Sequence, residues 1–132
     1  MEMKYVKPLV DENVITSYEE VSGFMFPVSY KEFIAKFNGG RPSLKCFKTK
    51  AGSEKVIKSF LSFNRKDRES IWNVTEWNEA ELQNQYIPFA IEPAGNLICM
   101  DKKDKSIVFI ELETLRTESV SPDFKSFISE LF

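Results

Sequence analysis

The side chains best able to do chemistry in this chain are carboxylates, because the sequence contains no histidine. It therefore lacks the usual general base and the commonest zinc ligand. Glu111 and Glu113 stand two positions apart at the end of an apolar stretch, so they would face the same side of a strand. Paired carboxylates support acid–base catalysis where an apolar pocket shifts one of their pKa values. Nothing around this pair predicts such a pocket, so we expect a solvated strand end and no enzymatic activity.

Two adjacent glycines, Gly39 and Gly40, are the other feature that suggests ligand chemistry. A glycine-rich loop binds phosphate when it precedes a helix, because the free amide groups and the positive end of the helix dipole then point at the anion. These glycines follow a predicted helix instead. They therefore indicate the end of that helix and not a phosphate site.

Two tryptophans with nearby carboxylates form the candidate binding set. They lie in a more polar segment, residues 64–85, for which we expect one irregular helix or two helical turns. The tryptophans are expected to cover the sheet as core or lid residues, and the alternative is a role as partner-facing anchors, since tryptophan is enriched at interface hot spots. The candidate partner-binding residues are Trp72, Glu76, Trp77, Glu79 and Glu81.

The elements that must position these residues begin with a complete helix within residues 26–42. Its apolar stripe has the i, i+3, i+4, i+7 spacing of a helix with one buried face and consists of Tyr30, Phe33, Ile34 and Phe37. Pro27 suits the first turn, and Asn38 followed by Gly39 tolerates the left-handed conformation at the C-terminus. Pro42 then prevents any further helix.

A shorter helix is predicted just before it. Thr16 and Glu19 have the spacing of a capping box, which predicts a helix over residues 17–22 that ends at Gly23. Its apolar side would pack beside the second helix and consists of Val14, Tyr18 and Val21. Residues 1–13 have few apolar anchors, so we expect an extended arm or a fraying strand there.

Strands follow the second helix. Residues 43–49 and 54–63 are rich in large apolar side chains on either side of a turn, which predicts a β-hairpin. Three further apolar stretches, residues 86–91, 96–100 and 106–112, are joined by connections short enough for an antiparallel meander.

A C-terminal helix completes the predicted set. Ser121 is the expected cap, Pro122 the first helical residue, and Asp123 lies near the positive end of the dipole. The apolar stripe of this helix consists of Phe124, Phe127, Ile128 and Leu131. The order of elements predicts an α+β fold, a mainly antiparallel sheet of about five strands covered by an N-terminal helical pair and a C-terminal helix, in one domain spanning residues 1–132.

The charge is small overall but unevenly distributed. Residues 1–66 carry 12 basic and 7 acidic side chains, whereas residues 67–132 carry 6 and 13. The basic set on and near the predicted hairpin consists of Arg41, Lys45, Lys48, Lys50, Lys55 and Lys58. We expect it to be a solvated sheet edge, with a surface for anionic groups as the alternative. The net charge of −2 argues against a nucleic-acid partner, and the acidic second half suits a basic protein.

Composition adds limits on size, compartment and cofactors. A chain of 132 residues can bury a core without disulfides, and its 12 phenylalanines predict an aromatic one. Cys46 and Cys99 lack the spacing of a metal or redox motif, so we expect buried thiols, with a disulfide between neighbouring strands as the alternative. No segment resembles a signal peptide or a membrane span. We therefore expect a cytoplasmic protein without cofactor or metal, either monomeric or weakly homodimeric.

Two blocks of sequence carry a family resemblance. The first contains Phe26-Pro27, then Tyr30-Lys31-Glu32-Phe33-Ile34, then Asn38-Gly39-Gly40 with Pro42. The second contains Ile87-Pro88-Phe89, then Gly95-Asn96-Leu97-Ile98-Cys99, then a strand over residues 106–110. In their order and spacing these blocks resemble the SUKH superfamily, the Smi/Knr-like domains, from about residue 14 to residue 132. The chain has Phe26 where the family more often has leucine, and it departs from the family pattern at Ala90, Glu92 and Ala94.

The resemblance implies a function and a role for the motif residues. Many members of the superfamily are bacterial immunity proteins, which implies a non-enzymatic protein that binds and neutralises a cognate toxin, possibly a nuclease, in the cytoplasm. The alternative is a regulatory or scaffold domain of the same fold that binds an endogenous partner. The motif residues are then expected to be structural, and they are Pro27, Tyr30, Phe33, Asn38, Gly39, Gly40, Pro42, Pro88, Phe89, Gly95 and Asn96.

Overall fold

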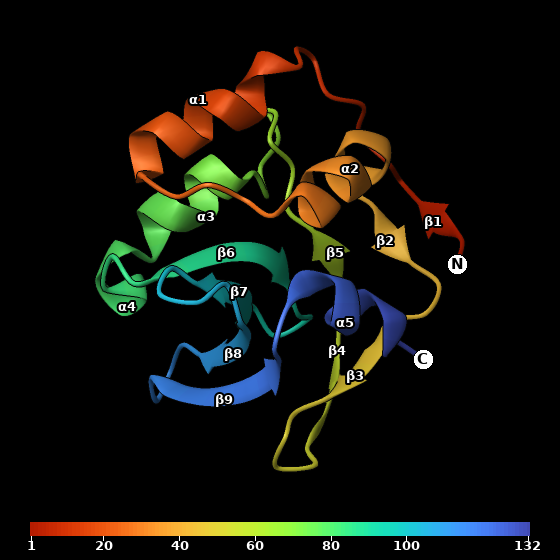
Figure 1. Ribbon diagram of the computed structural model, residues 1–132, viewed down its shortest axis with the longest axis vertical. Coiled ribbons are helices and arrows are strands. Elements are labelled where there is room, and N and C mark those ends of the chain that lie inside the picture. The colour runs from red at the N-terminus through yellow and green to blue at the C-terminus, as the bar shows by residue number, and fades with distance from the viewer.

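A five-stranded antiparallel sheet forms the centre of the fold (Figure 1). The computed structural model describes residues 1–132. In spatial order the strands of this sheet are β5 (Ser59–Phe60), β6 (Tyr86–Ile91), β7 (Leu97–Asp101), β8 (Ile107–Glu111) and β9 (Arg116–Ser121). Two smaller antiparallel pairs are β1 (Met3–Lys4) with β2 (Arg41–Pro42), and β3 (Cys46–Lys48) with β4 (Glu54–Val56). The helices are α1 (Asn13–Ser22), α2 (Val28–Phe37), α3 (Ile71–Trp77), α4 (Glu79–Leu82) and α5 (Phe124–Ser129).

The predicted meander is confirmed as the middle of the large sheet. Strands β6, β7 and β8 pair in sequence, so that Ile98 lies opposite Ala90 on one side and Phe109 on the other. All five residues of β7 are buried, so this central strand is covered on both faces. The edge strand β9 was not predicted, because five of its six residues are polar and show no apolar alternation.

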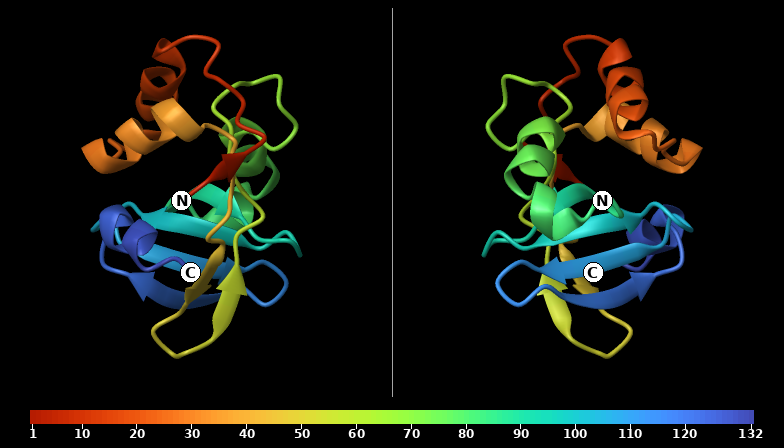
Figure 2. Two further views of the ribbon diagram at one scale, coloured as in Figure 1. Left: turned by 90° about the vertical axis from the view of Figure 1, so that its right-hand side faces the viewer. Right: turned by 90° about the vertical axis from the view of Figure 1, so that its left-hand side faces the viewer.

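The predicted hairpin is confirmed but is shorter than expected. Only β3 and β4 pair in it, with Phe47 opposite Lys55. The chain then leaves the hairpin, and Ser59–Phe60 joins the large sheet as β5 instead of continuing β4. Figure 2 shows this hairpin at one end of the molecule and the pair α1–α2 at the opposite end.

The α1–α2 pair is confirmed, but the capping box predicted at Thr16 is wrong. Helix α1 already begins at Asn13, so Thr16 lies inside it. Glu19 is buried near the C-terminal end, where its carboxylate accepts the backbone N–H of Phe26 at 2.8 Å and pairs with Lys31 at 3.0 Å. This carboxylate therefore fixes the turn between the two helices, and α1 ends at Gly23 (φ 70°) as predicted.

The residues at two other helix ends differ from the prediction. Asn38 has φ −49°, so it is not left-handed, and Gly39 adopts that conformation alone with φ 69°. The cap of α5 is Asp123, whose Oδ1 accepts the Ser126 N–H at 2.7 Å. Ser121 is instead the last residue of β9.

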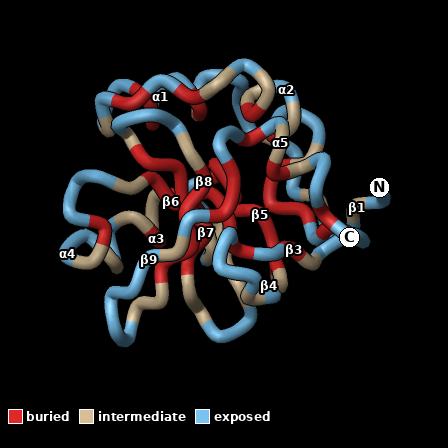
Figure 3. Tube along the Cα trace, turned by 60° about the horizontal axis from the view of Figure 1, so that its bottom comes forward, coloured by how far each residue is buried: buried red, intermediate tan, exposed pale blue.

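The core is one cluster of 29 buried residues, many of them aromatic. Figure 3 shows the buried segments gathered in the middle of the molecule. Tyr30 of α2 lies against Phe124 of α5, with ring centroids 5.1 Å apart. Phe89 of β6 lies against both Phe124 and Phe127, at 5.6 and 5.7 Å. These contacts confirm that α2 and α5 dock on the sheet. Phe33, however, is only partly buried beside this cluster.

Candidate functional site

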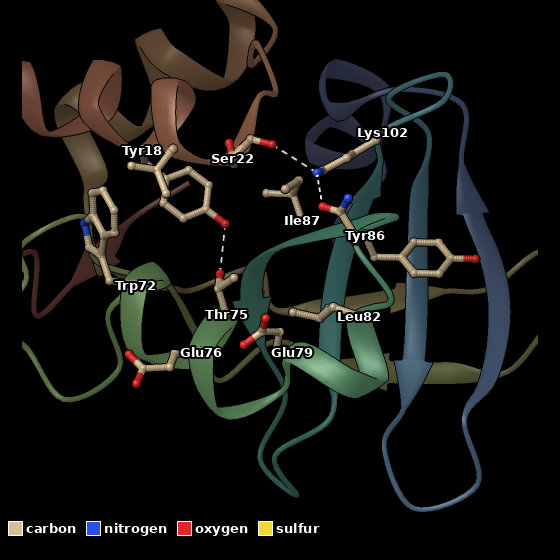
Figure 4. Close-up of a pocket in the computed structure, with 12 residues that line it drawn as sticks. Tyr18, Ser22, Trp72, Thr75, Glu76, Glu79, Leu82, Tyr86, Ile87 and Lys102 are labelled. Atoms are coloured by element: carbon tan, nitrogen blue, oxygen red, sulfur yellow. Dashed lines mark hydrogen bonds between the residues drawn. The ribbon is translucent and has the colours of Figure 1, made fainter.

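A groove of about 370 Å³ lies between α1, α3, α4 and the start of β6 (Figure 4). Its walls are largely aromatic or aliphatic. The apolar lining residues are Tyr18, Val21, Trp72, Leu82, Tyr86 and Ile87. We call this feature the α1–α3 groove.

Several contacts fix the position of Trp72 in the wall of the groove. Ser70 caps α3 by accepting the N–H of Asn73 at 3.1 Å, and the indole Nε1 of Trp72 donates to the Phe63 carbonyl at 3.1 Å. The guanidinium carbon of Arg65 lies 3.5 Å from the centroid of the Trp72 ring, a cation–π contact. Trp72 is therefore an ordered wall, and this half-buried position agrees with the predicted lid over the sheet.

A hydrogen bond joins the two sides of the groove. The hydroxyls of Tyr18 on α1 and Thr75 on α3 lie 2.8 Å apart, and the Tyr18 ring meets the Trp72 ring edge-on at 5.1 Å. At the far end, Lys102 donates to the Ser22 carbonyl at 3.0 Å and to Asn84 Oδ1 at 2.7 Å. Figure 4 shows these bonds spanning the groove. They fix its width in the free protein.

Two exposed carboxylates, Glu76 and Glu79, stand on the rim of the groove. Neither belongs to an ion pair. The ion pairs of the protein are Lys31–Glu19, Lys55–Glu118 and Lys58–Glu69. The only cation in the groove lining, Lys102, is bonded to neutral acceptors. The rim therefore presents uncompensated negative charge beside an apolar surface.

The tyrosines of the groove stay neutral at physiological pH. Burial raises the pKa of Tyr18 to about 12, and the hydrogen bond from Thr75 only partly opposes it. Burial also raises the pKa of Tyr86, with the charge of Asp101 adding to the effect. No group of three or more potential metal ligands occurs in the protein. The groove thus offers hydrogen bonds, apolar contact and negative charge, which are the means of binding a partner.

The structure brings three of the five candidate binding residues to the groove, namely Trp72, Glu76 and Glu79. Trp77 lies outside the groove lining with 57 % of its surface exposed, so it is not a core residue. Glu81 is half-buried and also lies outside the lining. Their role in partner binding stays a prediction.

Sequence reasoning missed three residues that shape the groove, Tyr18, Thr75 and Lys102. Tyr18 was assigned only to the packing side of a helix, and nothing in the local sequence pairs it with Thr75, 57 positions away. Val21, predicted on the same packing side, is 76 % exposed and lines the groove.

The first family motif is built around the buried side chain of Asn38. Its Nδ2 donates to the Lys7 carbonyl at 2.7 Å and to the Ser62 hydroxyl at 3.0 Å, while its Oδ1 accepts the Phe63 N–H at 2.8 Å. One amide therefore ties the N-terminal segment and the chain after β5 to the end of α2. Pro42 pairs with Met3 in the β1–β2 ladder.

The second motif forms the β6–β7 turn. Pro88 precedes a register shift in β6, and Gly95 has φ 92° in the turn. Asn96 Nδ2 donates to Glu92 at 2.9 Å, and its Oδ1 accepts the Leu112 N–H at 3.0 Å. Glu92, one of the departures from the family pattern, therefore stabilises the turn directly.

The remaining candidates for chemistry lie apart from the groove. Glu113 is in the exposed turn after β8, so it does not share a strand face with Glu111, contrary to the prediction. Cys46 and Cys99 are both free thiols, and burial raises the pKa of Cys99 well above its usual value. Cys46 is only half-buried.

The helices cover an antiparallel sheet and the α1–α3 groove opens beside it, which defines an α+β fold. Residues 12–128 match the SUKH_6 family, described as SMI1-KNR4 cell-wall, so the chain belongs to this family. The resemblance to the SUKH superfamily is thereby confirmed. No curated protein matches the chain. No helix here combines the length and apolar character that crossing a membrane requires.

Proposed function

We propose that this protein is a non-enzymatic immunity protein that binds and neutralises a cognate bacterial toxin through the α1–α3 groove. The observation that carries the proposal is that two exposed carboxylates, Glu76 and Glu79, stand beside an apolar wall without an ion-pair partner. Family membership is consistent with this role.

The chemistry of the groove favours a basic partner. An arginine or lysine side chain could place its aliphatic part along Trp72 and its charge between the rim carboxylates. Val21 in the groove lining is exposed, as is Trp77 next to Glu76 in the sequence, and large aromatic side chains supply much of the binding energy at protein interfaces. A toxin that acts on nucleic acid carries a basic active site, which such a surface can occlude.

The prearranged groove suits tight and rapid inhibition. Because the Tyr18–Thr75 bond and the cap at Ser70 already hold the walls, binding requires little ordering of the free protein. Opposite charges on the two partners also accelerate their association. One copy of this protein is then expected to bind one copy of the toxin in the cytoplasm.

Co-expression with the product of the adjacent upstream gene tests the proposal. The wild-type protein should restore growth of cells that make the toxin and should co-purify with it. The double variant Glu76→Lys/Glu79→Lys should lose protection. The control Glu54→Lys/Glu113→Lys changes the net charge equally at exposed sites outside the groove and should protect normally.

Two results would contradict the proposal. One is the absence of protection by the wild-type protein against that gene product. The other is recovery of a housekeeping enzyme as the main partner in the native host, which would favour the regulatory or scaffold alternative.

A further inference from the structure

A second groove, of about 680 Å³, lies beside the N-terminal segment and the strands β2 and β5. Four segments line it: residues 5–7, residues 39–41, residues 58–62 and the loop 66–69. The first two segments are distant in the sequence from each other and from the last two, which are neighbours. We call this feature the basic groove.

Hydrogen bonds around the buried Asn38 side chain bring together the segments that line the basic groove. Asn38 exchanges hydrogen bonds with Lys7, whose N–H donates to the Asn38 carbonyl at 2.8 Å. The Ser62 hydroxyl receives a bond from Asn38 and donates to Asp67 Oδ2 at 2.6 Å, which fixes the 66–69 loop. Gly40 accepts the Phe60 N–H at 2.9 Å. The family motif Asn38-Gly39-Gly40 therefore holds the lining segments together through these hydrogen bonds.

The lining carries five cations and two carboxylates. Both carboxylates are engaged, since Asp67 accepts the Ser62 hydroxyl and Glu69 pairs with Lys58 at 2.7 Å. The remaining four cations have no carboxylate partner and are Lys7, Arg41, Lys66 and Arg68. All four are exposed, and Arg41 is held over the Tyr5 ring at 5.2 Å. The groove therefore has an uncompensated positive charge.

The groove differs from the basic hairpin that the sequence suggested. Lys55 on the hairpin pairs with Glu118 and lies over Phe109, and Lys48 lies over Phe132. Of the predicted basic set, only Arg41 and Lys58 line the basic groove.

We infer that the basic groove binds a short acidic segment of a protein, at a site separate from the α1–α3 groove. Its positive charge complements a run of Asp and Glu side chains, which can bond to the free cations. A nucleic acid is less suited. The groove lining has a single exposed aromatic ring, Tyr5, and Arg41 lies over it at 5.2 Å, whereas single-stranded nucleic acids are bound by stacking successive bases on several such rings.

Fluorescence anisotropy with a labelled peptide tests this site without any toxin. The probe is an alternating Asp-Glu peptide of about eight residues, which in extended form rises ~3.3 Å per residue. The wild-type protein should bind it, and added salt should weaken binding because the contacts are between exposed charges. The matching Asn-Gln peptide should not bind.

Charge reversal locates the site. Lys66→Glu/Arg68→Glu should weaken binding about tenfold or more, since two attractions toward the acidic peptide become repulsions. The control Lys103→Glu/Lys125→Glu makes the same change in net charge at exposed sites outside the groove and should have little effect. If the loop variant fails to fold, Arg41→Gln tests the same groove from another segment. This milder change should also weaken binding.

Three results would overturn the inference. The first is absence of binding by the wild-type protein, and the second is equal weakening in the groove variant and the control. The third is tighter binding of an oligothymidylate that displaces the peptide, which would assign the groove to a phosphate backbone. None of these outcomes bears on toxin neutralisation through the α1–α3 groove.

Discussion

At the scale of single residues, Tyr30 is the unusual member of the aromatic core. Its side chain is fully buried, and its hydroxyl is the one buried side-chain polar atom without a hydrogen-bond partner. Burial accordingly raises its pKa well above the usual value for tyrosine. An unpaired buried hydroxyl costs stability, while the ring itself contributes packing with Phe124 and Phe89.

Tyr30→Phe should therefore increase the free energy of unfolding by about 1 kcal/mol, because it removes the unpaired hydroxyl and keeps the ring. Urea denaturation followed by circular dichroism measures the change. A loss of stability of similar size would show that the hydroxyl has a partner in solution.

Phe33 and Phe89 both belong to the family motifs but differ in how far their side chains are buried. Phe89 is completely buried between α5 and the sheet, so Phe89→Ala should cost about 4 kcal/mol. Phe33 is only partly buried, so Phe33→Ala should cost roughly half as much. Chemical denaturation of both variants checks the order, and equal losses would contradict this account of the core.

At the scale of elements, the end of α2 combines backbone strain with close packing. Gly39 has φ 69°, and a Cβ atom there would lie 3.3 Å from the Lys7 side chain. Gly23 at the end of α1 has nearly the same φ, 70°, but nothing lies within 4 Å of the added atom. A comparison of the two glycines therefore separates the cost of the backbone conformation from the cost of the close contact.

Both substitutions by alanine should destabilise, by about 1 kcal/mol for the left-handed conformation. Gly39→Ala should lose more than Gly23→Ala, because the Lys7 side chain must also shift by a few tenths of an ångström. Comparing the free energies of unfolding checks this, and a larger loss in Gly23→Ala would argue against it.

The cap of α5 predicts a pH dependence. The Ser126 N–H donates to Asp123 and lowers its pKa below the usual value. Because the folded pKa is the lower one, this stabilisation is present above the pKa of an unfolded Asp and disappears as the pH falls through the folded value.

Asp123→Ala should accordingly be less stable than wild type at neutral pH, and the difference should narrow when the pH is lowered below about 4, the pKa of an unfolded Asp. Asp123→Asn is the control, since asparagine also caps helices but does not titrate there. Urea denaturation at both pH values provides the comparison. A difference that does not change with pH would refute this role for the charge.

At the scale of the whole molecule, local patterns predicted the helices and the meander because each has a complete period within a few residues. The stripes that begin at Tyr30 and Phe124 and the three apolar stretches of the meander are examples. β9 escaped prediction because its mostly polar sequence shows no apolar alternation, although it pairs with the preceding strand β8 across a short turn. β1 lies in the segment predicted as an extended arm or a fraying strand, and its partner, Arg41–Pro42, is distant in the sequence. Helix caps were mislocated at Thr16, which lies inside α1, and at Ser121, since Asp123 caps α5 two residues later.

The two grooves were predictable only in part, for the same reason. Trp72, Glu76 and Glu79 share one short segment, so sequence reasoning could group them. The opposite wall with Tyr18, and the four segments of the basic groove, come together only through long-range bonds such as those of Asn38. The structure thus converts the uneven charge of the chain into an acidic and a basic groove.

The most direct test of the proposed function is a calorimetric titration of the purified toxin with this protein. We predict a one-to-one complex that Glu76→Lys/Glu79→Lys weakens by about tenfold or more, because both rim charges become repulsive toward a basic partner. The control Glu54→Lys/Glu113→Lys should bind like wild type. Equal affinities for all three proteins, or no complex with the wild-type protein, would contradict the assignment of the α1–α3 groove as the toxin-binding surface.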